Sequence, residues 1–327
     1  MKINFFVTMA LFFSVTAWAH EQAVSIKNKS IQNVHSPSKK QSKKRFPVLT
    51  ADKVALIAAE LDEISGLATT ADHFWGHNDS LGEAAIYAFD KHSLKLERIV
   101  HIEGAANFDW EELAQDDDFI YIADTGDNIA FRRSVDIYKV AKVDLEKIMT
   151  DSTVSSLEHN SAVPSSTVKS VKLNIRYAAK NNFLPTKEHN FDSEALTVVA
   201  DDLWLFTKNR LNQQASLYKL DKSAQQQKVS ASIELPVKGL ITAADYNADN
   251  NKLLLLGYSQ YTPNWGAFIW VMDVVDQLPV WQSAKRYKIE PYGQWEAIKW
   301  ISDSHFVAAA EDSRHSKQTL GYFKLPN

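Results

Sequence analysis

Cysteine is absent from all 327 residues of the chain. Disulfides therefore cannot stabilise the fold, and its stability must come from a buried core. The same absence excludes a cysteine nucleophile and a lipid anchor on a cysteine that follows a leader segment. The sequence also contains neither a G-x-S-x-G nucleophile elbow nor a glycine-rich phosphate loop, so it carries no motif for a serine hydrolase of that type or for a P-loop enzyme.

Long apolar runs are missing after the first nineteen residues. Those residues combine a basic start at Lys2, the apolar run INFFVTMALFFSVT and the A-x-A sequence Ala17-Trp18-Ala19, which is the pattern of a secretory signal peptide. We expect residues 1–19 to be removed. The mature chain is then exported, periplasmic or secreted, and has no transmembrane segment.

Charge is unevenly distributed along the mature chain. Residues 20–48 carry seven Lys or Arg and one Glu, a net charge of +6, and the remainder carries −11. The basic segment is rich in Ser, Asn and Gln and has no hydrophobic period, so we interpret residues 20–48 as a disordered linker. Residues 49–327 then form the folded domain, whose acidic balance argues against a nucleic-acid partner.

The folded part repeats a short pattern. NFDWEELA at 107–114, NFDSEALTV at 190–198 and YGQWEAIKW at 292–300 each begin a unit of up to four runs rich in aliphatic and aromatic residues. Such runs, separated by turn residues, are typical of strands and hairpins. A unit of four strands that recurs along the chain indicates a blade of a β-propeller. We therefore predict an all-β fold, a single propeller of five blades, with units that start near residues 64, 110, 193, 241 and 295.

Two features of the chain bear on the blade count. The last unit has only three strands, and the run KVALIAAEL at 53–61 can supply a fourth, so we expect this N-terminal strand to complete the last blade and close the ring. The second unit is longer than the others because it contains the polar stretch 145–167, which we interpret as an inserted loop or a short helix. A further blade in that stretch would make six, and six blades are the alternative.

The glutamates of the repeated pattern occupy equivalent positions. The first strand of each propeller blade lies innermost, so the unit starts face one another around one mouth of the central channel. Clustered carboxylates raise one another's pKa or require a cation. The alternative is structural, with each Glu accepting hydrogen bonds from backbone N–H groups and joining the blades. We align the units on the apolar residue that follows each repeated Glu. The equivalent positions then form a ring of five residues around the mouth: Ser65, Glu111, Glu194, Thr242 and Glu296.

Polar residues also follow the second strand of each unit, at the same end of the blade. In DTGDN at 124–128, two aspartates lie beside a glycine turn. Oxygen ligands of this kind suit Ca²⁺, whereas the basic residues suit an anion. The ligand candidates at the mouth are Glu111, Glu194, Glu296, Lys208, Arg210, Glu311, Asp79 and Arg132. The candidate metal ligands are Asp124, Asp127, Glu111, Glu194 and Glu296.

The motif series D-x-E-A-L, ADTGDN, LWLFTKNR, ITAADYN and EAI followed by AAAED resembles a family of exported bacterial β-propellers of uncharacterised function, distantly similar to phytase-like, esterase-like propeller proteins. The resemblance covers residues 53–325. It implies a phosphoesterase-like hydrolase assisted by Ca²⁺ at the channel mouth. The alternative is a non-catalytic propeller that binds a glycan, a peptide or an envelope partner. In either case we expect a monomer that takes a small-molecule, anionic or glycan ligand at the mouth.

Overall fold

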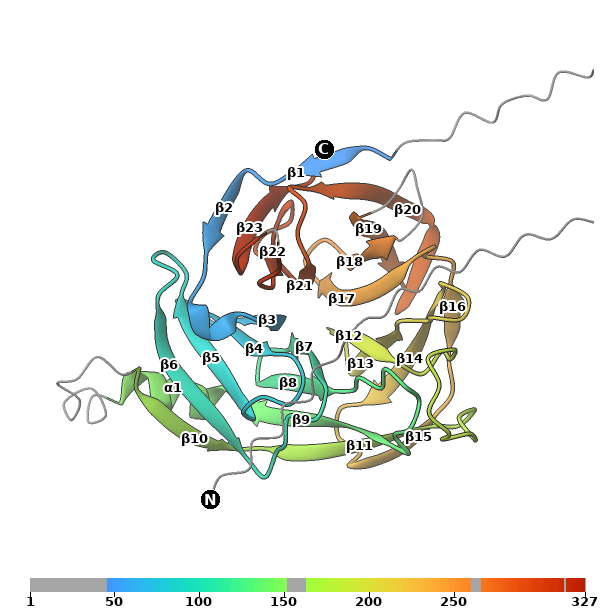
Figure 1. The fold of residues 1–327 in the computed structure, drawn as a ribbon, viewed down its shortest axis with the longest axis horizontal. Coiled ribbons are helices and arrows are strands. Elements are labelled where there is room, and N and C mark those ends of the chain that lie inside the picture. Colours follow the sequence, from blue (N-terminus) through green and yellow to red (C-terminus); the bar gives the residue numbers. More distant parts are fainter. Residues whose placement is uncertain (1–45, 152–162, 260–265, 315, 327) are drawn as a thin grey trace, which may run out of the picture. The chain divides into compact units, whose positions relative to one another are not determined.

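Five β-sheets surround a central axis in the computed structural model of the protein (Figure 1). The structure describes residues 46–151, 163–259, 266–314 and 316–326, so the predicted signal peptide and most of the predicted linker lie outside the described residues. The innermost strand of each sheet contacts those of its two neighbours, and the ring closes between the last blade and the first. The fold is the predicted five-bladed β-propeller. Its innermost strands are β3 (Ile64–Thr69), β7 (Trp110–Gln115), β12 (Ser193–Val199), β17 (Leu240–Asn247) and β21 (Trp295–Trp300).

Three antiparallel strands follow each innermost strand outward. The second strands are β4 (His73–Asn78), β8 (Phe119–Asp124), β13 (Asp202–Thr207), β18 (Lys252–Ser259) and β22 (His305–Ala310). The third strands are β5 (Ala85–Asp90), β9 (Val135–Ala141), β14 (Ala215–Asp221), β19 (Gly266–Val275) and β23 (Thr319–Lys324). The fourth strands are β6 (Leu96–Glu103), β11 (Val171–Tyr177), β16 (Ile233–Leu235), β20 (Leu278–Glu290) and β2 (Lys53–Leu56).

The N-terminal strand closes the last blade, as predicted, because β2 pairs with β23. It is shorter than the run 53–61, however. After Leu56 the chain leaves the sheet and forms the 3₁₀ helix η1 (Ala59–Leu61). The reason is packing: Ile57 and Leu61 are buried in the core between the first and last blades, which a continued edge strand would not allow.

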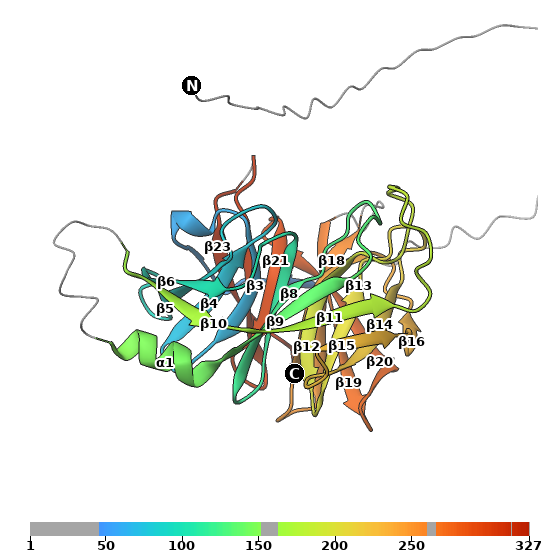
Figure 2. The ribbon, with the colours of Figure 1, turned by 90° about the horizontal axis from the view of Figure 1, so that it is seen from below.

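Three blades carry a fifth strand that the repeat did not predict. β10 (Ser165–Lys169) pairs in parallel with β6, β15 (Gln226–Val229) with β11, and β1 (Val48–Thr50) with β20. Each added strand covers the open edge of a sheet. The predicted insertion contains most of α1 (Lys142–Thr150), which lies at the periphery of the propeller (Figure 2). Within the described part of the chain, no helix has the length and apolar character needed to span a membrane.

The hydrophobic core consists of five clusters, one between each pair of neighbouring blades. Each sheet is therefore covered on both faces, which is why the strands contain nearly continuous apolar runs. Trp110 and Trp295, which directly precede two of the ring glutamates, are buried in these clusters, and each indole N–H donates to a backbone carbonyl four residues earlier. The cluster between the fifth blade and the first closes the ring.

Candidate functional site

Every innermost strand contains a β-bulge at the same position. The pairing with the second strand skips one residue in each blade, and these five residues form the ring predicted from the repeat: Ser65, Glu111, Glu194, Thr242 and Glu296. A bulged residue leaves the regular ladder, and bulges redirect side chains near functional sites. Here the irregularity repeats five times around the axis, at the mouth where the innermost strands begin.

The mouth contains a small cavity of about 80 Å³. Four of the five ring residues line it, together with residues that follow the second strands, whereas Thr242 of the ring does not. Arg132, Asp124 and Asp127 are not among the lining residues, and Arg210 reaches the site through its carboxylate partners. The lining comprises Glu63, Ile64, Ser65, Asp79, Glu111, Asn128, Glu194, Lys208, Glu296 and Glu311.

Glu111 is the centre of the acidic part of the mouth. Its carboxylate lies in two groups whose oxygen atoms are all within 4.8 Å of one another, one with Asp79 and Asp109 and the other with Asp192 and Glu194. The side chain is only 5% exposed, yet it accepts no hydrogen bond from the described residues. Burial, followed by the charges of Glu194 and Asp79, raises the pKa of Glu111 well above its usual value. The arrangement therefore needs protons or a cation.

Gly126 makes this clustering possible. It lies in the turn after β8, and an added Cβ atom would overlap Oε1 of Glu111 and the carboxylate of Asp109. Any side chain at this position would fill the space that the two carboxylates use. Burial, together with the charges of Asp79 and Asp192, raises the pKa of Asp109 to about 7.

Two basic residues reach the mouth, and both are paired with carboxylates. Lys208 donates to Glu194 in a short ion pair, and neighbouring carboxylates, with Glu194 first, raise the Lys208 pKa against the opposing effect of burial. The Arg210 Nε and Nη2 atoms donate to one oxygen of Asp192 at 2.9 and 2.7 Å. Both cations therefore hold carboxylates in place, and neither is free to receive an anion by itself.

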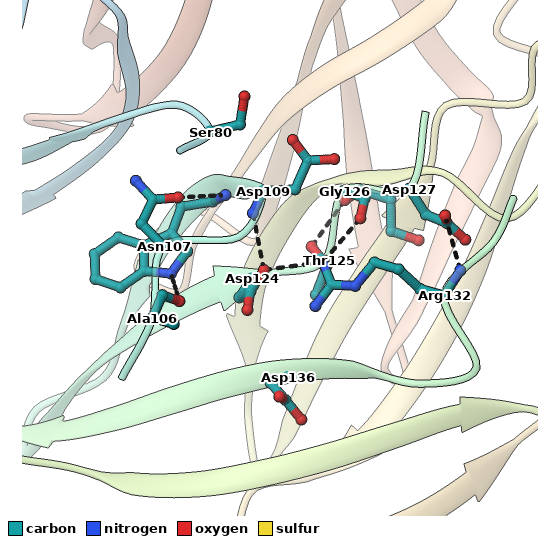
Figure 3. Close-up of polar contacts among 12 residues, drawn as sticks. Ser80, Ala106, Asn107, Asp109, Asp124, Thr125, Gly126, Asp127, Arg132 and Asp136 are labelled. Atoms are coloured by element: carbon teal, nitrogen blue, oxygen red, sulfur yellow. Dashed lines mark hydrogen bonds and ion pairs between the residues drawn. The ribbon is translucent and has the colours of Figure 1, made fainter. Parts of the chain in front are cut away.

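The predicted metal ligands Asp124 and Asp127 lie in ion pairs of their own. Asp124 accepts from Arg132 Nη1 at 2.9 Å and from the Asp109 backbone N–H at 3.1 Å (Figure 3). Asp127 forms a buried ion pair with Lys180. Arg132 Nη1 also donates to the Gly126 carbonyl at 2.9 Å. These contacts shape the turn, and through it they position Gly126 and Asp109 at the mouth.

The opposite side of the mouth contains a second acidic pair, Glu296 and Glu311. Burial raises the pKa of Glu311 to about 8, with Glu296 and Asp79 as the next causes. Burial likewise raises the pKa of Glu296, while Lys208 lowers it. The Gln294 side-chain amide donates to Glu311 at 3.0 Å. This side of the mouth therefore retains a carboxyl proton at neutral pH.

The structural role that we considered for the ring glutamates belongs to a different residue. Glu112 is fully buried, and its carboxylate accepts backbone N–H groups of Leu67, Leu113 and Ala244, which lie in three innermost strands. It thus ties the strands together across the channel. Glu111, its direct neighbour, has no such partner among the described residues.

Sequence reasoning missed three carboxylates at the mouth: Glu63, Asp109 and Asp192. Asp109 and Asp192 each stand two residues before a ring glutamate, in the repeated sequence NFD. The repetition of the aspartate was the available signal. Asn128, the last residue of DTGDN, donates to Asp109 at 3.4 Å and accepts from Arg210.

No protein-family model matches the chain, and no curated protein matches it. Similar solved structures include the WD40 repeats of RRP9 (TM-score 0.44, 9% identity, 86% of this chain and 100% of that chain). Another is the PQQ-bound aldose sugar dehydrogenase from Streptomyces coelicolor (TM-score 0.45, 10% identity, 83% of this chain and 98% of that chain). At these identities the likeness concerns the fold alone, and the five-blade assignment rests on the strand pairing.

Proposed function

We propose that the protein is an exported β-propeller that binds Ca²⁺ at the mouth of its channel and uses the bound cation in a phosphoesterase-like hydrolysis. The observation that carries the cation site is Glu111. Its buried carboxylate accepts no hydrogen bond from the described residues and belongs to both groups of clustered oxygens. Buried charges are normally paired or coordinate a metal, and a divalent cation would satisfy both groups at once.

The donor set suits calcium. Ca²⁺ takes six to eight oxygen ligands and prefers carboxylates, amide oxygens and water. Asp79, Asp109, Glu111 and Glu194 supply carboxylates, Asn128 borders the same cavity, and no thiol is available. Bound calcium would supply the positive charge that polarises a phosphoryl oxygen and offsets charge in the transition state.

The protein's own residues would orient the ligand. Lys208 and Arg210 fix Glu194 and Asp192, so the metal-binding oxygens are preorganised. Burial, followed by the charge of Glu296, raises the pKa of the Glu311 carboxyl to about 8, and its proton is shared with Glu296 beside the ligand. Export rests on the signal-peptide pattern of residues 1–19.

A second candidate function is calcium-dependent binding without catalysis. The cavity of about 80 Å³ is far below the roughly 300–1,000 Å³ of typical small-molecule sites. A glycan, a peptide or an envelope partner would then lie over the mouth, and the cation would contact both the partner and the carboxylates of the mouth.

Calorimetric titration of CaCl₂ and MgCl₂ into chelator-treated protein tests the cation site. We expect Ca²⁺ to bind and Glu111→Gln to weaken it by at least about tenfold, or 1.4 kcal/mol. The matched control Asp273→Asn, at a surface ion pair with Lys252, should bind as the parent does. Absence of Ca²⁺ binding in the parent would refute the proposal.

Release of nitrophenol from para-nitrophenyl phosphate, measured with Ca²⁺ and with chelator, separates the two functions. Calcium-dependent turnover that Glu111→Gln abolishes supports the hydrolase. Calcium binding without turnover on a panel of phosphate esters supports the binding protein.

A further inference from the structure

Exposed apolar side chains gather beside the acidic mouth. They lie in the loops of the second and third blades at the mouth end, and they are 37% to 73% exposed. Single exposed apolar residues are common, but contiguous patches mark binding surfaces. We call the following set the apolar rim: Phe108, Ile129, Phe131, Leu184 and Leu211.

The apolar rim has two parts, which Ala130 connects along the chain. The rings of Phe108 and Phe131 lie 5.9 Å apart. Ala130, between Ile129 and Phe131 in the chain, lines a cavity of about 300 Å³ together with Leu184 and Leu211. We call this cavity the rim pocket. Its size equals the lower end of ligand pockets, so a chain or a ring can enter it.

The apolar rim also adjoins the polar mouth directly. Phe108 precedes Asp109, Ile129 follows Asn128, and Leu211 follows Arg210 in the chain. A ligand with its polar end at the mouth would therefore place its other end on the apolar rim.

A positive charge borders the same surface. Arg133 is exposed, its guanidinium stacks 4.6 Å from the centre of the Phe183 ring, and it forms no ion pair with the described residues. A cation on an aromatic face remains available to an anionic group.

We propose that the ligand of the mouth is an amphiphilic anion, a phosphate monoester whose alkyl or aryl group enters the rim pocket. This inference rests on the proposed function and names its substrate class. A small ester fits better than a lipid surface, because the apolar rim covers only one side of the mouth and is hollowed by the rim pocket. Burial of one CH₂ group contributes about 0.8 kcal/mol, so a short alkyl chain adds substantial affinity.

Two phosphonates test the proposal, because they share the anionic head and resist hydrolysis. Calorimetry of the calcium-loaded full chain should show hexylphosphonate binding at least about tenfold more tightly than methylphosphonate. Leu211→Ser and Leu184→Ser should remove most of that preference and leave methylphosphonate and Ca²⁺ affinities unchanged. Leu278→Ser, at an exposed position in the fourth blade at the end of the propeller away from the mouth, should keep the preference.

Equal affinity for the two phosphonates would overturn the inference while leaving the cation site intact. Failure of Ca²⁺ itself to bind would refute the proposed function. In that case a Leu211-dependent preference for hexylphosphonate without metal would still support the rim pocket. Two other results would also overturn the inference. If the protein binds phosphatidylglycerol vesicles through Leu211 but does not bind hexylphosphonate, the occupant is a membrane. If the protein is a dimer and Leu211→Ser makes it a monomer, the occupant is a second copy of the chain.

Discussion

Replacing Glu111 and Glu112 one at a time by Gln separates a ligand site from a structural support. The two residues are adjacent in the chain and both buried, but within the described part of the chain only the Glu112 carboxylate accepts backbone hydrogen bonds. We expect opposite outcomes: Glu112→Gln destabilises the protein and keeps its calcium response, whereas Glu111→Gln keeps stability and loses that response.

The cost at Glu112 follows from its partners. Oε1 accepts the N–H groups of Leu113 at 3.0 Å and Leu67 at 3.4 Å, and Oε2 accepts that of Ala244 at 3.2 Å. Burial raises the pKa of Glu112 well above its usual value against the effect of these hydrogen bonds, but even a protonated carboxyl keeps an acceptor lone pair on both oxygens. Gln offers one acceptor oxygen, so its amide nitrogen must face an N–H donor. A buried donor left unpaired costs about 1–3 kcal/mol. For a domain of this size that lowers the melting temperature by roughly 2–4 °C for each kcal/mol.

The outcome at Glu111 has a different cause. In the metal-free protein Gln removes one charge from a cluster of carboxylates, so stability should stay constant or rise. Calcium at about 100 times its dissociation constant should add about 2.7 kcal/mol to the parent and to Glu112→Gln, because it binds only the folded state. Glu111→Gln should show little of this gain.

Thermal melts of the three proteins, each with calcium and with chelator, provide the assay. The reasoning fails if Glu111→Gln is destabilised as much as Glu112→Gln without metal, because Glu111 would then be a second structural support. It also fails if all three proteins respond equally to calcium.

Three further predictions concern the buried ion pair of Asp127, the N-terminal strands and the Glu311 carboxyl. Lys180→Met leaves Asp127 buried without its cation and should cost about 3–5 kcal/mol in denaturant unfolding; a cost below 1 kcal/mol would show that the pair does not support the turn. A chain that begins at Phe46 should melt as the full chain does. One that begins at Ile57 lacks both β1 and β2 and should melt lower or aggregate, because two sheets lose their outer strand; equal melting would contradict the closure. Burial raises the pKa of Glu311 from 4.5 to about 8 in the fold, so the unfolded chain loses this proton at a lower pH than the folded chain. The stability of the metal-free protein should therefore fall as pH rises from about 4.5 to 8. Thermal melts across this range should show a smaller fall for Glu311→Gln.

The repeated pattern was sufficient to predict the blades and the ring because both depend on local sequence. Apolar runs of strand length, separated by turns, specify strands wherever they occur, and one blade resembles the next. The alignment of NFDWEELA with NFDSEALTV therefore placed Glu111 and Glu194 at equivalent positions, and the β-bulges confirm that equivalence.

Other assignments depended on residues that are distant in the chain. DTGDN has the composition of a cation-binding turn. In the fold, however, Asp127 forms an ion pair with Lys180, more than fifty residues later, and Asp124 forms one with Arg132. The parallel fifth strands likewise depend on where a connecting segment meets the edge of a neighbouring sheet, which no local propensity encodes.

The sequence by itself determined a closed propeller with acidic residues around one mouth and favoured five blades over six, since strand patterning and the repeat period are local properties. Only the tertiary structure decided what each carboxylate does. Glu111 and Glu112 have the same chemistry and adjacent positions, and the bulge turns one toward the mouth while the other meets backbone N–H groups from across the channel. Partners gathered from five blades decide which buried charge is satisfied and which is left for a ligand.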